Sequence, residues 1–300
     1  MKNALMIILV FTLLFLTTVP SETEVTPSIS AENAVVLDMD TNEIIFEKNA
    51  NQQKNIASIT KIMTAIVALE QEEIKDRVLI SRNAAMKEGS SIYTKPGDIY
   101  TLEDLIYGLM LRSGNDAATA IAEHVGGSVK GFAFLMNQKA TWIGMNNSSF
   151  QNPHGLDEEN HYSTAYDMAL LTSYAMSTNS DFRKIFGTKK HLPENINYYW
   201  FNKNKMLMTN DYCTGGKTGF TKSAGRTLVT TAERNGEQIV VVTLNASSDW
   251  QDHRTLYDYG FKALEDQSDP IDEEILDFPQ FIESYFDVIH RMHGVRQWSI

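Results

Sequence analysis

The chain has 300 residues, of which 43% are hydrophobic, and its formal net charge is −12. This length allows one large domain with its own core, and the single cysteine, Cys213, excludes an internal disulfide. The acidic balance argues against nucleic acid as a partner, because phosphates attract basic surfaces, and against electrostatic docking on anionic lipid. The seven histidines show no metal-ligand spacing, so we expect no metal site.

Residues 1–21 predict a targeting segment. Lys2 gives a positive start, and residues 4–19 form an almost uninterrupted apolar run. The run is short for a membrane span, so we favour a cleaved signal peptide over an N-terminal anchor. Cleavage is expected after Ser21, and Ser28-Ile29-Ser30 offers a second site. In both cases we expect export, with the bulk of the protein facing the outside of the membrane.

The first structured part of the chain predicts a β-hairpin followed by a buried helix. Residues 34–39 and 43–47 are apolar and β-branched, and residues 62–69 form a longer apolar run. Because helix positions i and i+3 share a face, the Ser58 hydroxyl and the Lys61 amine can meet just before that run. A serine nucleophile needs a base, and burial and nearby cations would keep Lys61 neutral enough to be one.

Helices dominate the middle of the chain. After a short strand and a turn, Thr101 with acidic residues behind it predicts a capped helix, and residues 116–125 predict the next one. The motif Ser113-Gly114-Asn115 therefore lies in a tight link between rigid elements. Further helices are predicted at residues 132–143 and from an N-cap at Ser163.

His154, in the turn Asn152-Pro153-His154-Gly155, could also be considered as a catalytic base. Lys61 already fills that role, and histidines in loops often bond only to the backbone. We therefore expect a structural role for His154.

The last part of the predicted domain returns to strands. Lys217-Thr218-Gly219-Phe220 leads to a strand at residues 226–232, and the Asn-Gly turn at 235–236 predicts a hairpin with residues 238–244. Residues 252–264 predict a closing helix. The order predicts an α+β fold, with a largely antiparallel sheet built from both chain ends and an inserted all-helical subdomain.

Several motifs together resemble those of a known family. The penicillin-recognising acyl-serine enzymes have Ser-x-x-Lys, Ser-x-Asn and Lys-Thr-Gly motifs in this order. The matching segments here are Ser58-Ile59-Thr60-Lys61, Ser113-Gly114-Asn115, Lys217-Thr218-Gly219, Asn152-Pro153-His154-Gly155-Leu156-Asp157, His161-Tyr162-Ser163-Thr164-Ala165-Tyr166-Asp167 and Tyr259-Gly260-Phe261. Residues 31–264 thus resemble the low-molecular-weight penicillin-binding proteins that act as serine-type D-alanyl-D-alanine carboxypeptidases.

The resemblance implies a β-lactamase/transpeptidase-like fold and an enzyme that needs no cofactor. Its expected substrate is the D-Ala-D-Ala end of peptidoglycan stem pentapeptides, and β-lactam antibiotics are expected to inhibit it covalently. Ser58 would be the nucleophile, Lys61 its general base and Ser113 the relay of a proton to the leaving amine. The backbone N–H groups of Ser58 and Phe220 would form the oxyanion hole, and Lys217 would help to keep Lys61 neutral.

The same resemblance implies a substrate-binding set made of Asn115, Lys217, Thr218, Gly219 and Phe220. The Asn115 amide would hold the substrate carbonyl, and Lys217 and Thr218 would grip the terminal carboxylate. Gly219 would let the substrate backbone lie close to its strand.

One departure from the family concerns the second cation that would hold the substrate carboxylate, in addition to Lys217. An arginine that contacts the substrate carboxylate lies about ten residues before the aromatic-Gly-Phe segment in the relatives. This chain has Asp249 there, and Arg254 is near it in sequence. We expect Asp249 to point away from the substrate and Arg254 to reach in from the following helix.

The tail at residues 265–300 is too short for a further domain but has apolar residues at helical spacing. It could pack on the domain or lie on the membrane as an amphipathic anchor, although its acidic residues disfavour anionic lipid. Membrane attachment through the N-terminal segment or this tail is thus a possibility that the sequence leaves open.

Two other functions compete with the carboxypeptidase. A class A-like β-lactamase needs a glutamate that activates water, and no matching Glu-x-x-x-Asn element lies in the expected loop before Lys217. A catalytically idle wall-binding protein on the same scaffold would have no reason to keep the complete set of motif residues. The sequence therefore favours the carboxypeptidase.

Overall fold

The computed structural model describes residues 26–268. The expected signal peptide or anchor at residues 1–21 and the tail beyond residue 268 lie outside the described residues. Within residues 26–268, no helix has both the length and the apolar character needed to cross a membrane.

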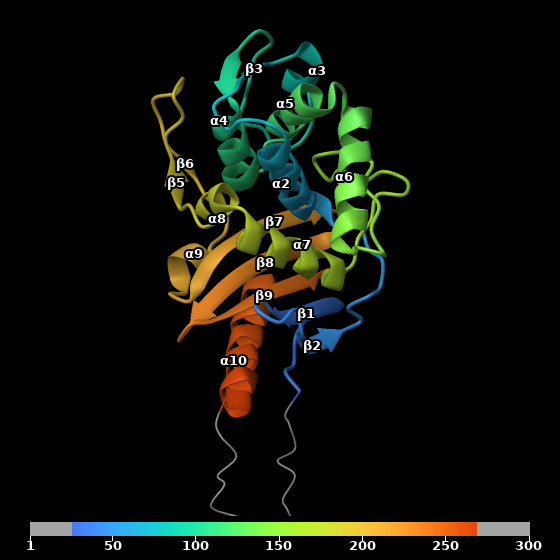
Figure 1. The fold of residues 1–300 in the computed structure, drawn as a ribbon, viewed down its shortest axis with the longest axis vertical. Coiled ribbons are helices and arrows are strands. Elements are labelled where there is room, and N and C mark those ends of the chain that lie inside the picture. Colours follow the sequence, from blue (N-terminus) through green and yellow to red (C-terminus); the bar gives the residue numbers. More distant parts are fainter. Residues whose placement is uncertain (1–25, 269–300) are drawn as a thin grey trace, which may run out of the picture.

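A five-stranded sheet joins the two ends of the described chain (Figure 1). Its order is β2-β1-β9-β8-β7, and all neighbouring strands are antiparallel. Its strands are β1 (Asn33–Asp38), β2 (Ile44–Lys48), β7 (Cys213–Thr221), β8 (Gly225–Arg234) and β9 (Glu237–Leu244). The predicted α+β fold, with an antiparallel sheet built from both chain ends, is confirmed.

The two faces of the sheet pack into different hydrophobic clusters, because successive side chains of a strand point to opposite faces. Val35 and Leu37 of β1 join the large cluster that also includes the helices of the inserted part. Ala34 and Val36 of the same strand join a second cluster with Phe261 and its neighbours in α10 (Asp249–Ser268). Figure 1 shows the inserted helices on one side of the sheet and α10 on the other.

The inserted part contains most of the helices and four short β-strands. The helices are α2 (Lys61–Gln71), α3 (Arg82–Ala85), α4 (Leu102–Tyr107), α5 (Asn115–Gly126), α6 (Val129–Ile143), α7 (Ala165–Thr178), α8 (Ser180–Phe186) and α9 (Met206–Thr209). A 3₁₀ turn, η1 (Ala57–Thr60), precedes α2, and a π-helical turn, η2 (Gly108–Arg112), extends α4. The short strands pair as β3 (Arg77–Leu79) with β4 (Ile99–Thr101) and β5 (Lys190–His191) with β6 (Trp200–Phe201).

The helix caps test the local sequence predictions. The Thr101 hydroxyl accepts a 3.0 Å hydrogen bond from the Asp104 backbone N–H, so the predicted cap is confirmed. The predicted cap at Ser163 is wrong by one residue, because Thr164 caps α7. The Ser163 hydroxyl instead pairs with the Ser148 hydroxyl at 2.7 Å, which leaves it unable to cap the helix.

Candidate active site

Ser58 and Lys61 lie at the junction of η1 and α2. Ser58 is within the 3₁₀ turn, and Lys61 is the first residue of α2 and fully buried. The Lys61 Nζ atom lies 3.0 Å from the Ser58 Oγ atom. Ala57, just before Ser58, has a left-handed backbone with φ of 49°, a conformation that costs energy for a residue with a side chain. The turn therefore holds Ser58 in a fixed place above the start of the helix.

The partners of Lys61 determine where its lone pair points. Its Nζ atom lies 2.8 Å from the Asn115 Oδ1 atom and 2.7 Å from the His154 carbonyl oxygen. Both oxygens are acceptors, so they take the two N–H groups of a neutral amine. The remaining direction faces the Ser58 Oγ atom. A neutral Lys61 is thus arranged to accept the proton of the Ser58 hydroxyl.

Electrostatics favour that neutral form. Burial, the Lys217 charge and the Lys203 charge together hold the pKa of Lys61 well below its usual value. Burial and the charge of Lys203 also lower the pKa of Lys217, to about 7. The site therefore contains two amines that both lose their proton at a lower pH than free lysine does.

The turn around His154 packs directly on the Ser58 turn. A Cβ atom on Gly155 would lie 1.9 Å from the Ala57 carbonyl oxygen, so only glycine fits there. His154 is buried, and its Nδ1 atom accepts a hydrogen bond from the Leu156 backbone N–H at 3.2 Å. Burial and the Lys61 charge lower the pKa of His154 to about 2. Because its ring faces its own turn, His154 contributes its carbonyl, rather than its imidazole, to the site.

Ser113 and Asn115 flank the start of α5. Ser113 has a left-handed backbone with φ of 64° and ends the π-helical turn, and its Oγ atom accepts a 3.1 Å hydrogen bond from the Lys217 Nζ atom. The Asn115 side chain is buried, and its Nδ2 atom donates to the Glu88 carbonyl oxygen at 2.7 Å. Its side-chain oxygen therefore bonds to Lys61 and one of its two N–H groups bonds to Glu88.

Gly219 lets strand β7 lie against the Ser58 turn. A Cβ atom at this position would lie 2.8 Å from the Ser58 backbone nitrogen and 2.4 Å from the Thr227 Oγ1 atom. Neither neighbour can move easily, since one is backbone and the other is a buried side chain that donates to the Ile56 carbonyl oxygen. The glycine thus brings the edge of β7 next to Ser58.

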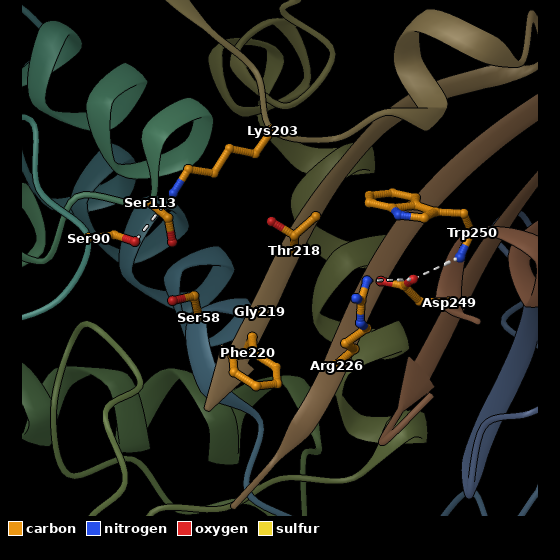
Figure 2. A pocket seen from close by; sticks show the side chains of 10 residues that line it. All are labelled: Ser58, Ser90, Ser113, Lys203, Thr218, Gly219, Phe220, Arg226, Asp249 and Trp250. Carbon is orange, nitrogen blue, oxygen red and sulfur yellow. Dashed lines mark hydrogen bonds and ion pairs between the residues drawn. The ribbon is translucent and has the colours of Figure 1, made fainter. Parts of the chain in front are cut away.

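A pocket of about 440 Å³ opens over these residues (Figure 2). Its lining residues are Ser58, Ser90, Ser113, Lys203, Thr218, Gly219, Phe220, Arg226, Asp249 and Trp250. Of the expected site residues, Ser58, Ser113, Thr218, Gly219 and Phe220 line the pocket, whereas Lys61, Asn115 and Lys217 lie behind its wall and contact the lining residues or one another. The three sequence motifs thus meet at one place in the fold.

Arg254, which we expected to replace the carboxylate-binding arginine of the relatives, does not reach the pocket. Arg254 is in α10, where its guanidinium donates to the Thr209 hydroxyl at 3.4 Å, and it does not line the pocket. Asp249 does line the pocket, contrary to our expectation, and its Oδ1 atom lies 3.6 Å from the Arg226 Nη1 atom.

Ser90, Lys203, Arg226 and Trp250 were not identified from the sequence. Ser90 and Lys203 belong to no motif, and the Lys203 amine donates to the Ser90 hydroxyl at 3.3 Å. A signal existed for Arg226, because the strand after Phe220 was predicted. The observed register pairs Phe220 with Arg226. A hairpin drawn for this segment would therefore have placed Arg226 beside the Lys217-Thr218-Gly219 motif.

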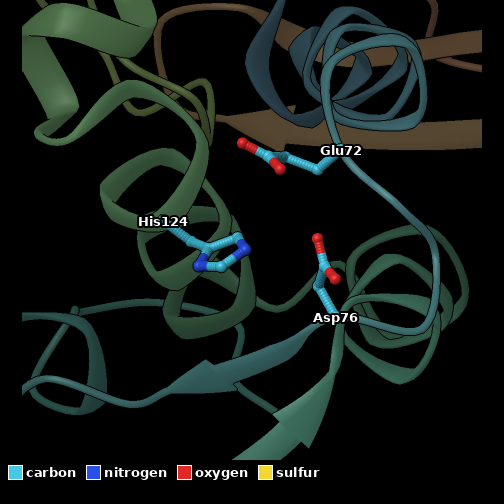
Figure 3. Close-up of side chains that lie close together, drawn as sticks. All are labelled: Glu72, Asp76 and His124. Atoms are coloured by element: carbon cyan, nitrogen blue, oxygen red, sulfur yellow. The ribbon is translucent and has the colours of Figure 1, made fainter.

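Three other side chains converge at the end of α2, away from the pocket (Figure 3). The ligand atoms of Glu72, Asp76 and His124 all lie within 4.8 Å of one another. Sequence spacing does not reveal this cluster, because its members come from a loop and from α5. Surface acidic groups commonly lie this close without a metal ion, and we assign the cluster no role.

Comparison with known proteins finds a family model and a relative that have the same description. Residues 20–248 match the family model described as D-alanyl-D-alanine carboxypeptidase. The D-alanyl-D-alanine carboxypeptidase DacF of Bacillus subtilis is 37% identical over 226 residues, which cover 73% of this chain and 58% of that protein. The chain therefore spans less than two thirds of the length of this relative.

Two solved structures resemble the whole described domain. The D-alanyl-D-alanine carboxypeptidase of Mycobacterium tuberculosis has a TM-score of 0.76 and 29% identity, and the alignment covers 81% of this chain and 95% of that one. The Streptomyces K15 DD-transpeptidase has a TM-score of 0.74 and 31% identity, with coverage of 79% and 99%. Both are similar in fold as well as in sequence.

Proposed function

The chain belongs to the D-alanyl-D-alanine carboxypeptidase family, and from this premise we propose that it removes the terminal D-Ala from peptidoglycan stem pentapeptides. The proposed reaction passes through an acyl-enzyme on Ser58. The observation that carries the proposal is the buried Lys61 amine, 3.0 Å from the Ser58 hydroxyl, with both of its N–H groups directed at other oxygens.

In the proposed acylation step, the Ser58 Oγ atom attacks the carbonyl carbon between the two D-Ala residues. Its proton passes to the Lys61 Nζ atom as the new C–O bond forms. The backbone N–H groups of Ser58 and Phe220 donate to the oxygen that becomes negative, which is worth a few kcal/mol in the transition state. The close approach of β7 at Gly219 supports this pairing of two backbone donors.

The tetrahedral intermediate then loses its C–N bond. The leaving amine of D-Ala takes the proton that Lys61 accepted from Ser58, relayed through the Ser113 hydroxyl, which the Lys217 amine holds at 3.1 Å, and Lys61 is neutral again. Water next attacks the ester carbonyl and gives a proton to Lys61. Lys61 returns this proton to the Ser58 oxygen as the ester C–O bond breaks, which releases the shortened peptide and regenerates the Ser58 hydroxyl. In this proposal Asn115 acts through Lys61, because its Oδ1 atom bonds to the Lys61 amine and Asn115 does not line the pocket.

The proposed substrate fixes where the protein acts. Peptidoglycan stem peptides are outside the cytoplasmic membrane, so we propose that the chain is exported to the cell wall space, by the signal that residues 1–21 predict. β-Lactam antibiotics would acylate Ser58 in place of the peptide. Attachment to the membrane through the N-terminal segment or the tail remains a proposal about residues outside the described range.

The pentapeptide reaction can be tested directly. A purified stem pentapeptide incubated with the protein is expected to lose one alanine residue and to release free D-Ala, both measured by mass spectrometry. A class A-like β-lactamase would instead turn over a β-lactam many times and leave the pentapeptide intact. An unchanged pentapeptide in the presence of active, penicillin-labelled protein would contradict the carboxypeptidase proposal.

The pH dependence of acylation should reflect both amines. Acylation needs neutral Lys61, so the rate rises with pH as Lys61 loses its proton, and burial moves this acid limb below the range of free lysine. Substrate binding needs charged Lys217, so the rate falls as pH passes about 7. Because the two amines interact, the limbs report apparent pKa values of the pair.

The variant Lys217→Arg separates these limbs. Arginine keeps its charge at all relevant pH values, so the alkaline limb near pH 7 should move upward while the acid limb remains. The measurement is the second-order rate of penicillin labelling across pH. An alkaline limb that stays in place in Lys217→Arg would show that Lys217 does not cause it.

A further inference from the structure

A carboxylate lines the same pocket as Thr218, the pocket in which a carboxylate-terminated substrate should be held. Asp249, the first residue of α10, has a side chain that is 7% exposed, and its Oδ1 atom accepts a hydrogen bond from its neighbour's N–H at 3.1 Å. An unopposed carboxylate at this place would repel the terminal carboxylate of the peptide. The pocket therefore needs a cation between Asp249 and the substrate.

Arg226 is in a position to supply that cation. It lies on β8 directly opposite Phe220 of β7, so it adjoins the motif strand that approaches Ser58. In Figure 2 its side chain points toward Asp249. Its Nη1 atom is 3.6 Å from the Asp249 Oδ1 atom, and its side chain is 56% exposed.

The guanidinium of Arg226 has N–H donors that are available to a ligand. A distance of 3.6 Å is an ion contact rather than a hydrogen bond. Among residues 26–268 no hydrogen bond from the Arg226 side chain to protein is found. A guanidinium carries five N–H donors in a planar fork that matches the two oxygens of a carboxylate. Asp249 thus holds the arginine electrostatically without using up its hydrogen bonds.

We propose that Arg226 binds the C-terminal carboxylate of the substrate together with Thr218, and so determines the preference for peptides with a free C-terminus. The inference rests on the proposed carboxypeptidase function and names a residue for its specificity. The arginine comes from strand β8, while the position of the expected arginine at the start of α10 is occupied by its acidic partner.

Other cations fit this role less well. Arg254 is half-buried on α10, does not line the pocket and donates to the Thr209 hydroxyl. Lys203 lines the pocket, but its amine donates to Ser90, and in the view of Figure 2 it lies across the pocket from Arg226, with Thr218 between them. Arg226 is therefore the lining cation on the Asp249 side.

The test compares two peptides that differ only at the C-terminus. One is the pentapeptide with a free carboxylate and the other is its C-terminal amide, and both are assayed with excess enzyme so that slow cleavage is measured. The readout is the ratio of kcat/KM for acid over amide. A charge-assisted pair of this kind corresponds to about a 10- to 100-fold loss of that ratio in Arg226→Gln.

Three comparisons make the test specific. Arg226→Lys should retain part of the preference, because it keeps the charge without the fork. Arg254→Gln, which removes an arginine outside the pocket, should keep the wild-type ratio. Thermal melts of all variants should agree, because the Arg226 side chain is at the surface.

The outcomes separate the two proposals. If wild-type protein cleaves neither peptide, the carboxypeptidase function is wrong. If wild-type protein prefers the acid and Arg226→Gln keeps the same ratio, the function stands and the role of Arg226 is overturned.

Discussion

Replacing Ser58 with alanine is expected to abolish covalent labelling by a fluorescent penicillin, with a loss of about 10⁴-fold or more in acylation rate. The Oγ atom is the only nucleophile that Lys61 contacts among the described residues, so its removal leaves no group able to form the ester. Alanine fits the same 3₁₀ turn, because the Ser58 hydroxyl has no bonding partner there except Lys61. Labelling is measured by gel fluorescence over time, with thermal melting as the check on folding.

Ser90→Ala is the matched control for this variant. Ser90 lines the same pocket and bonds to Lys203, but it has no contact with Lys61. It should still be labelled. Persistent labelling of a folded Ser58→Ala protein would show that another side chain is the nucleophile.

Replacing Lys61 with arginine should reduce acylation by about 10³- to 10⁴-fold, which is the size expected for loss of a general base. Arginine cannot give up its proton in a protein, so Ser58 would have no acceptor for its own. The measurement is the rate of penicillin labelling under excess reagent. Near-normal acylation by Lys61→Arg would mean that another group takes the proton.

Because Lys61 is fully buried, the larger guanidinium could disturb the fold. Lys61→Met provides a second variant of similar length with no charge, and it should be equally slow. Melting temperatures close to that of the wild type in either variant would assign the lost rate to chemistry rather than to unfolding.

The fold followed from local patterns because those patterns have simple physical causes. The alternating residues of β1 and β9 face two separate cores, which requires a sheet covered on both sides. The Asn235-Gly236 turn has positive φ at both residues, as the hairpin prediction requires. The segment around α9 and the short β5–β6 pair was not predicted, because its amphiphilic residues lack a clear period.

The candidate site was predictable to the extent that its residues lie in motifs. Ser58, Lys61, Ser113 and Lys217 were expected together, and they lie within hydrogen-bond distance in two pairs. The contacts of Asn115 were not predictable, since they depend on the Glu88 carbonyl in a loop far away in sequence. Arg226 was missed because its place depends on strand register, which a linear motif does not contain.

The most direct test of the central claim is peptide mapping of the protein after acylation by a β-lactam. Ser58, Ser90 and Ser113 all line the pocket, and trypsin separates them into residues 55–61, 88–112 and 113–130. We predict that the added mass of the opened β-lactam appears on residues 55–61 and nowhere else. An adduct on residues 88–112 or 113–130, with residues 55–61 unmodified, would contradict the account.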